Sequence, residues 1–198
     1  MIRRAALITS LLFPLITWTG YQIFGGPSIS DILTKGPLPL WLQLGWGAII
    51  GLAFYGMIYG MLTTSRMQPV RHHYNRLFRN VPMSMIDLVG ASLLAALTEE
   101  LFFRGWLQYH IGIIPTAIIF IGIHGYYYQR GVRGIFMLGV ALTVFAVVLG
   151  YLYEYAGYGA AVSAHLIYNM GMFWWVRTSI QRAHHQPDRS HYMQMHGK

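Results

Sequence analysis

Residues 134–153, GIFMLGVALTVFAVVLGYLY, decide the fold, because they form an uninterrupted apolar segment without a charged side chain. A transmembrane helix needs about 20 consecutive, mostly apolar residues. Arg133 and Glu154 border the segment at its two ends, where a membrane span would reach water. This stretch therefore predicts a helix that crosses a lipid bilayer.

Five further segments are predicted to span the membrane, although some carry isolated polar residues. They are residues 5–24, 38–62, 83–109, 113–128 and 159–176. The turn Gly25-Gly26-Pro27 ends the first segment, which we interpret as an uncleaved anchor because no small-residue cleavage site follows it. The second segment carries glycines at positions 45, 47, 51, 56 and 60, which predict close helix packing.

The composition agrees with a membrane solvent. Hydrophobic residues make up 55% of the chain and charged residues only 10%, whereas soluble domains carry about 25% charge. The absence of cysteine excludes disulfides, a cysteine nucleophile and thiolate metal ligands. We predict an all-α, polytopic membrane bundle of about six transmembrane helices. It would form one domain over residues 1–198, with accessory helices in 5–62, a core in 83–176 and a polar tail in 177–198.

The basic residues orient this bundle. The formal charge is +8, and cytoplasmic loops of membrane proteins are enriched in Lys and Arg. With both termini in the cytoplasm, only Lys35 is predicted outside and only Arg104 within a span. The others all fall in predicted cytoplasmic segments: Arg3, Arg4, Arg66, Arg71, Arg76, Arg79, Arg130, Arg133, Arg177, Arg182, Arg189 and Lys198. This distribution predicts a multi-pass protein of the cell (cytoplasmic) membrane that attracts anionic lipids at its cytoplasmic face, and it argues against nucleic-acid binding.

Ionisable residues within spans are costly and mark candidate functional sites. The third span carries Glu99, Glu100 and Arg104, the fourth carries His124, and the sixth carries His165 and Asn169. Counted from their non-cytoplasmic ends, these helices bring the side chains to a similar depth at about 1.5 Å per residue. Because the site is reached at a comparable depth from the non-cytoplasmic ends of three helices, we also expect the substrate to be cut near the outer face.

The spacing within each helix indicates roles for these side chains. Glu100 and Arg104 are four residues apart with the acid first, which favours an ion pair. Glu99 points about 100° away and is free to face the histidines. A buried carboxylate beside imidazoles can take a proton from water. The histidines could share that water or bind a metal, and Asn169 could donate to an oxyanion.

Taken together, Glu99-Glu100-x-x-x-Arg104, Phe120-x-x-x-His124 and His165-x-x-x-Asn169 resemble the motifs of the CAAX-protease and bacteriocin-processing (CPBP, or Abi) membrane family. The resemblance extends over residues 85–170 and implies a bacterial intramembrane endopeptidase. Such an enzyme cuts a membrane-protein or lipid-anchored peptide near its C-terminus or span, for example a C-terminal sorting signal.

The resemblance also implies roles for individual residues. Glu99 would activate water with His124, and His165 with Asn169 would stabilise the oxyanion. Glu100 and Arg104 would support the site. The cofactor is either none or a divalent metal such as zinc, with Glu99, His124, His165 and Asn169 as candidate ligands.

Two other functions remain open on the sequence. A non-catalytic membrane protein, such as an immunity factor that binds a partner, would use the same helix core without needing Glu99. A proton-coupled transporter would use Glu99 and the histidines as a relay. The absence of an internal repeat and of broken-helix signatures argues against transport. The sequence does not determine the oligomeric state.

Overall fold

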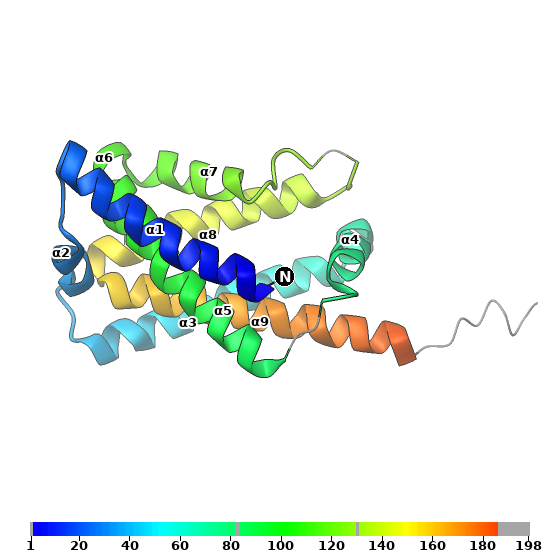
Figure 1. Ribbon diagram of the computed structural model, residues 1–198. Coiled ribbons are helices and arrows are strands. Elements are labelled where there is room, and N and C mark those ends of the chain that lie inside the picture. Colours follow the sequence, from blue (N-terminus) through cyan, green and yellow to red (C-terminus); the bar gives the residue numbers. More distant parts are fainter. Residues whose placement is uncertain (1, 82–83, 130, 186–198) are drawn as a thin grey trace, which may run out of the picture.

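The computed structural model describes residues 2–81, 84–129 and 131–185 of the chain, and in this part it is helical without strands. Figure 1 shows long helices that run side by side, with α1, α5 and α9 packed around the centre. The first element is α1 (Ile2–Phe24), followed by the short α2 (Ile29–Thr34). The all-α membrane architecture predicted from the sequence is confirmed.

Turn residues end α1, as the sequence predicts, and a capping serine begins α2, which was not predicted from the sequence. Gly25 and Gly26 have φ values of 74° and 99°, which a residue with a Cβ rarely adopts, and they end α1. Ser28 caps α2 because its hydroxyl accepts a hydrogen bond from the Asp31 backbone N–H at 3.2 Å. The Asp31 carboxylate in turn accepts from the Ser28 hydroxyl at 2.7 Å and from the Ser28 backbone N–H at 2.9 Å, and these bonds lower the pKa of this exposed acid.

Among the described helices, the most extensive packing is between α3 (Leu40–Thr63) and α9 (Tyr158–His185). Gly47 and Gly51 make this contact possible, since a Cβ at either position would lie within 2.5 Å of the Ala160 or Ala164 carbonyl oxygen. Gly45, Gly56 and Gly60 have open space instead. Among the described residues, only Gly47 and Gly51 of the five predicted glycines therefore allow the close approach of α3 and α9.

The core that positions the polar residues consists of five further helical segments. α5 (Met85–Glu100) continues without a break into the π-helical η2 (Leu101–Leu107) and then α6 (Gln108–Ile111). Gly112, with φ of 84°, turns the chain into α7 (Ile113–Ile123). α8 (Ile135–Tyr155) leads back to α9.

Two predicted boundaries were wrong. The span predicted over 113–128 is helical only to Ile123, because residues 124–128 form turns in which Gly125 has a φ of 83°. The last helix extends beyond Val176 to His185, so the start of the predicted polar tail is helical. The rest of that tail, together with Pro82, Met83 and Arg130, lies outside the described residues.

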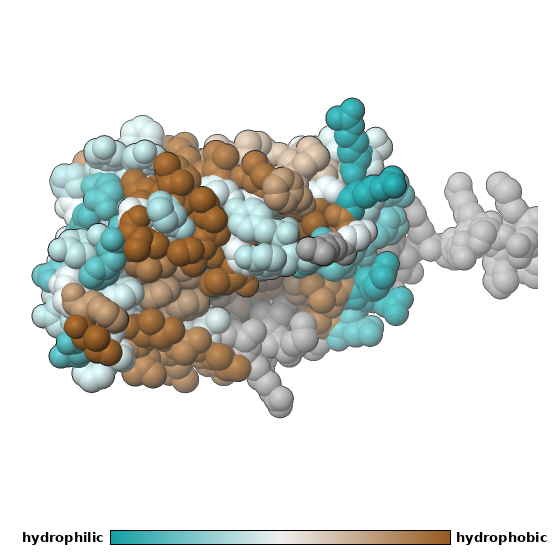
Figure 2. Space-filling view, turned by 90° about the horizontal axis from the view of Figure 1, so that it is seen from above, coloured by the Kyte–Doolittle hydropathy of each residue, from teal (hydrophilic) through white to brown (hydrophobic). Residues whose placement is uncertain are grey.

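The surface matches a protein embedded in a bilayer. Three of the described helices are long and apolar enough to cross it: Leu7–Phe24, Leu40–Thr63 and Ile135–Tyr155. The other three predicted spans also form helices, but with polar residues or shorter apolar runs. Figure 2 shows hydrophobic residues around the middle of the molecule and hydrophilic residues at both ends. Large apolar side chains such as Leu11, Trp41 and Phe136 are accordingly exposed.

One end of the bundle carries most of the described arginines, and we call it the arginine-rich end. There η1 (Ser65–Met67) and α4 (Gln68–Phe78) hold Arg66, Arg71 and Arg76, and α9 holds Arg177. Figure 1 shows α4 crossing the ends of the long helices rather than running along them, as expected of a helix on the membrane surface. At the opposite end Lys35 forms an ion pair with Glu154 rather than with the nearby Asp31. The Lys35 Nζ atom lies 2.6 Å from Glu154 Oε2.

Candidate active site

The polar residues of three helices converge in the interior of the bundle. Glu99 is 7% exposed on α5, and His165 is 5% exposed on α9. His124 follows directly after α7, where its side chain is partly exposed. The Nε2 atoms of both histidines lie 3.9 Å from the same carboxylate oxygen, Glu99 Oε2. Residues far apart in the sequence thus form one acid and histidine cluster.

The opposite ring nitrogen of each histidine has a fixed acceptor. His124 Nδ1 lies 2.6 Å from the Phe120 carbonyl oxygen, which can only accept a hydrogen bond, so Nδ1 donates. His165 Nδ1 lies 2.7 Å from Glu100 Oε1 and donates to this carboxylate in the same way. When the imidazoles are neutral, both Nε2 atoms are therefore left unprotonated and face Glu99 with their lone pairs.

Glu100 connects the cluster to a buried cation. It is fully buried, and its Oε2 lies 3.1 Å from Arg104 Nε in an ion pair. Arg104 is itself only 1% exposed and lies in the π-helical segment η2. Glu100 thus pairs with both Arg104 and His165, whereas the sequence indicated only the arginine. Spacing along one helix reveals the partner on that helix but not the partner that another helix supplies.

Aromatic rings complete the surroundings. The Phe120 ring packs edge-on against His124 and His165, with ring centroids 4.8 Å and 5.8 Å apart, and it also faces the Arg104 guanidinium at 4.9 Å. In the sequence Phe120 stands only as a motif position. Its ring contacts both imidazoles and the guanidinium, and such contacts are not visible in the sequence.

A cavity of about 420 Å³ opens beside the cluster. Glu99, His124, His165 and Asn169 all line it, and the side-chain amide of Asn169 makes no hydrogen bond to another described residue. The remaining lining is mostly apolar or aromatic and comes from α1, α4, α5, α9 and the turn after α7: Thr9, Tyr74, Phe78, Ala91, Ala95, Tyr126, Tyr168, Met172, Phe173 and Val176.

Two tyrosines that the sequence did not single out link this cavity to the surface helix α4. The Tyr74 hydroxyl donates a hydrogen bond to the Tyr126 hydroxyl at 3.0 Å. Burial, with Tyr126 nearby, raises the pKa of Tyr74 well above its ordinary value, so the phenol stays neutral and retains its proton. The amphipathic character of α4 predicted a surface helix but not its contact with the site.

A metal was one of the options that the sequence left open. Catalytic zinc usually takes three protein ligands at about 2.0–2.3 Å. Among the described residues no group of three or more His, Asp or Glu side chains is arranged to hold a metal ion. The described arrangement thus lends no support to a bound metal.

The fold and the cluster define a class: a helical membrane protein with an acid and a histidine buried between its helices and a second, partly exposed histidine beside them. The model of the family "Type II CAAX prenyl endopeptidase Rce1-like" matches residues 81–171, which include all six polar side chains of the site. Over this segment the chain is similar to that family of proteases, and the resemblance stated from the motifs is confirmed.

A curated relative matches the chain over a shorter stretch. The Uncharacterized protein YpbD of Bacillus subtilis (strain 168) is 34% identical over 74 residues. The match covers 37% of this chain and 36% of YpbD, so the chain matches little more than a third of that relative's length. No solved structure matches the chain.

Proposed function

We propose that this protein is an intramembrane endopeptidase in which Glu99 activates a water molecule for attack on a peptide carbonyl. One observation carries the proposal: the Nε2 atoms of His124 and His165 each lie 3.9 Å from the same oxygen, Glu99 Oε2. With both imidazoles neutral, all three atoms are hydrogen-bond acceptors, and a water molecule supplies the donors that such a set requires. The similarity of residues 81–171 to a protease family supports the same chemistry.

The hydrolysis follows from these groups. Glu99 accepts a proton while the water oxygen bonds to the carbonyl carbon, and the carbonyl oxygen becomes an oxyanion. The unpaired amide of Asn169, on the same cavity wall, is available to donate to this oxyanion. The tetrahedral intermediate then breaks its C–N bond, and the proton held by Glu99 passes to the leaving amine. No step requires a metal.

Glu100 and Arg104 act by positioning. The Glu100 carboxylate holds the Nδ1 proton of His165, which keeps its Nε2 directed at Glu99. Arg104 neutralises Glu100 and, being almost completely buried, lowers the cost of holding two acids side by side. Only Glu99 is then left as a base, because Glu100 is occupied by its two partners.

The cavity also indicates how a substrate reaches the site. It extends from Glu99 past Tyr74 and Phe78 of α4 to Phe173 and Val176 on α9, near the arginine-rich end. The positive-inside rule assigns this end to the cytoplasm. The cavity therefore favours substrate entry from the cytoplasmic side, in contrast to the outer-face entry expected from the sequence. Its apolar walls suit a membrane-embedded or lipid-anchored peptide.

The decisive experiment compares wild type with Glu99→Gln in host membranes by mass spectrometry of membrane-protein C-termini. We expect termini that are present with wild type and absent with Glu99→Gln, although both proteins fold equally well. Glu154→Gln is the matched control, because it makes the same chemical change near the opposite end of the bundle and should leave every terminus unchanged. Identical termini in all three strains would refute the peptidase and favour a binding or immunity protein.

A further inference from the structure

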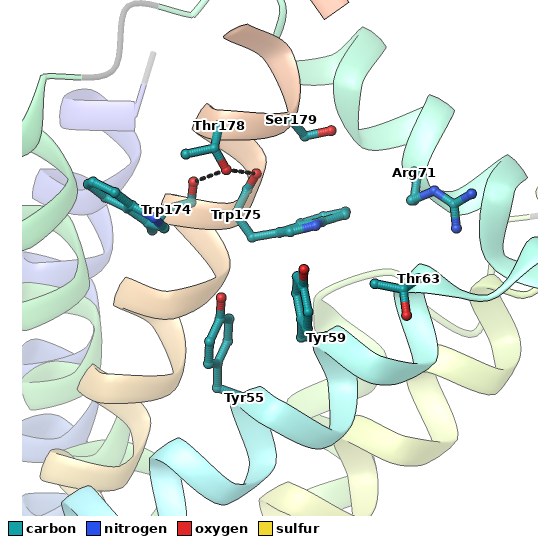
Figure 3. A pocket seen from close by; sticks show the side chains of 8 residues that line it. All are labelled: Tyr55, Tyr59, Thr63, Arg71, Trp174, Trp175, Thr178 and Ser179. Carbon is teal, nitrogen blue, oxygen red and sulfur yellow. Dashed lines mark hydrogen bonds between the residues drawn. The ribbon is translucent and has the colours of Figure 1, made fainter. Parts of the chain in front are cut away.

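A second cavity, of about 410 Å³, opens between α3, α4 and α9 at the arginine-rich end. Its lining shares no residue with the active-site cavity. Figure 3 shows the aromatic rings of Tyr59 and Trp175 reaching into the space between α3 and α9, with Arg71 of α4 to one side. Ligand sites in proteins commonly have volumes of about 300–1,000 Å³. The cavity is therefore large enough to hold a small molecule or the head of a larger one.

The cavity lies where the apolar part of the bundle meets water. Thr63, the last residue of α3 and of its candidate membrane span, lines the cavity. The rings of Tyr59 and Trp174 also line it and are about half exposed. Tyr and Trp are enriched at the level of lipid headgroups, where one part of the ring meets hydrocarbon and the other meets water. This position places the cavity at headgroup depth.

Arg71 gives the cavity its charge. One terminal nitrogen, Nη1, donates to the carbonyl oxygens of Leu62 and Thr64, which hold the guanidinium at the end of α3. The other guanidinium nitrogens of Arg71 donate to no described residue. No Asp or Glu is among the described residues that line the cavity, whereas Thr63, Thr178 and Ser179 add hydroxyl groups. A fixed guanidinium with spare donors and neighbouring hydroxyls is suited to a phosphate group.

We propose that this cavity binds the headgroup of a membrane phospholipid, with its phosphate against Arg71 and its glycerol end along Tyr59 and Trp174. The acyl chains would then follow the exposed apolar surfaces of α3 and α9. Inorganic phosphate shares the recognised group, but it lacks an apolar part that would use the aromatic rings. The site is distinct from the proposed catalytic cluster and does not depend on its activity.

Native mass spectrometry of the detergent-purified full-length chain tests this proposal. Phosphatidylglycerol is titrated in, with diacylglycerol of the same acyl chains and inorganic phosphate as separate probes. We expect one phosphatidylglycerol to be retained with at least tenfold higher affinity than either other probe. Diacylglycerol bound equally well would show that the headgroup is not recognised. Inorganic phosphate bound as tightly as the lipid would assign the cavity to a soluble anion.

Variants locate the binding. Arg71→Gln should weaken phosphatidylglycerol binding by about tenfold or more, because a charge-assisted hydrogen bond is lost. Ser179→Phe should abolish binding by filling the cavity, and it leaves the bonds from Arg71 to α3 intact in case Arg71→Gln fails to fold. Arg76→Gln is the matched control, since this exposed arginine carries the same charge on the same helix but does not line the cavity. We expect it to bind within twofold of wild type.

Two results with these variants would also overturn the proposal. Arg76→Gln and Arg71→Gln could weaken binding equally, which would indicate diffuse attraction to the whole arginine-rich end rather than a site. Alternatively, Ser179→Phe could retain phosphatidylglycerol at wild-type affinity, which would show that the lipid does not occupy the cavity.

Discussion

Replacing Glu100 with glutamine removes the charge that compensates the buried Arg104. The guanidinium is 1% exposed and its Nε lies 3.1 Å from Glu100 Oε2, so it has no route to water when the carboxylate is neutralised. Breaking a buried ion pair from one side costs about 3–5 kcal/mol, because the remaining charge stays buried without its partner. We expect Glu100→Gln to lose about this much free energy of unfolding.

The loss is measured by reversible unfolding in mixed micelles with increasing sodium dodecyl sulfate, followed by circular dichroism. Glu154→Gln is the matched control, because its ion pair with Lys35 is more than a third exposed and should be worth only about 0–1 kcal/mol. Glu100→Leu combined with Arg104→Met removes both charges together. This double variant should be more stable than Glu100→Gln, since no unpaired charge remains.

Two results would refute this explanation. One is a Glu100→Gln protein within about 1 kcal/mol of wild type, which would show that Arg104 finds another partner or reaches water. The other is a double variant no more stable than Glu100→Gln, which would show that the hydrogen bond to His165, rather than the arginine charge, sets the cost.

Two further predictions test the packing and the chemistry. Gly47→Ala should destabilise the protein by about 2 kcal/mol or more in the same unfolding assay, because its Cβ would lie 2.3 Å from the Ala160 carbonyl oxygen, and overpacking is costly. Gly45→Ala, which meets open space, should instead be neutral or stabilise the helix by up to about 1 kcal/mol, and equal effects at both positions would contradict the packing. Asn169→Ala should lower the cleavage rate about 10²–10³-fold with little loss of folded protein, as expected for an oxyanion donor, whereas an unchanged rate in a substrate cleavage assay would exclude this role.

The helical parts of the site could be predicted because a membrane limits what a sequence can do. An apolar segment in lipid must satisfy its backbone internally, so apolar runs such as residues 134–153 specify helices. A charge in such a segment is costly enough that Glu99 and Arg104 stand out against their neighbours. The pairing of Glu100 with Arg104 also follows from the sequence, since both lie on one helix.

Side-chain partners on different helices could not be predicted in the same way. The bond between Glu100 and His165 joins residues 65 positions apart, and no spacing rule relates α5 to α9. The π-helical backbone of Leu101–Leu107 and the early end of α7 at Ile123 likewise escaped the sequence analysis. Helix boundaries and helix rotations depend on how neighbouring side chains fill space, and this packing exists only in the folded chain.

The sequence by itself thus determined that the chain is a helical membrane protein, which end carries the arginines, and which polar residues lie within the helices. Hydrophobicity and charge act locally on each segment, so they can be read one segment at a time. Only the tertiary structure decided that Glu100 binds His165 as well as Arg104, that one oxygen of Glu99 lies at the same distance from both histidines, and that the cavity extends toward α4. These features depend on the rotation of each helix about its axis, which is fixed by contacts such as those of Gly47, Gly51 and Phe120 between segments distant in the chain.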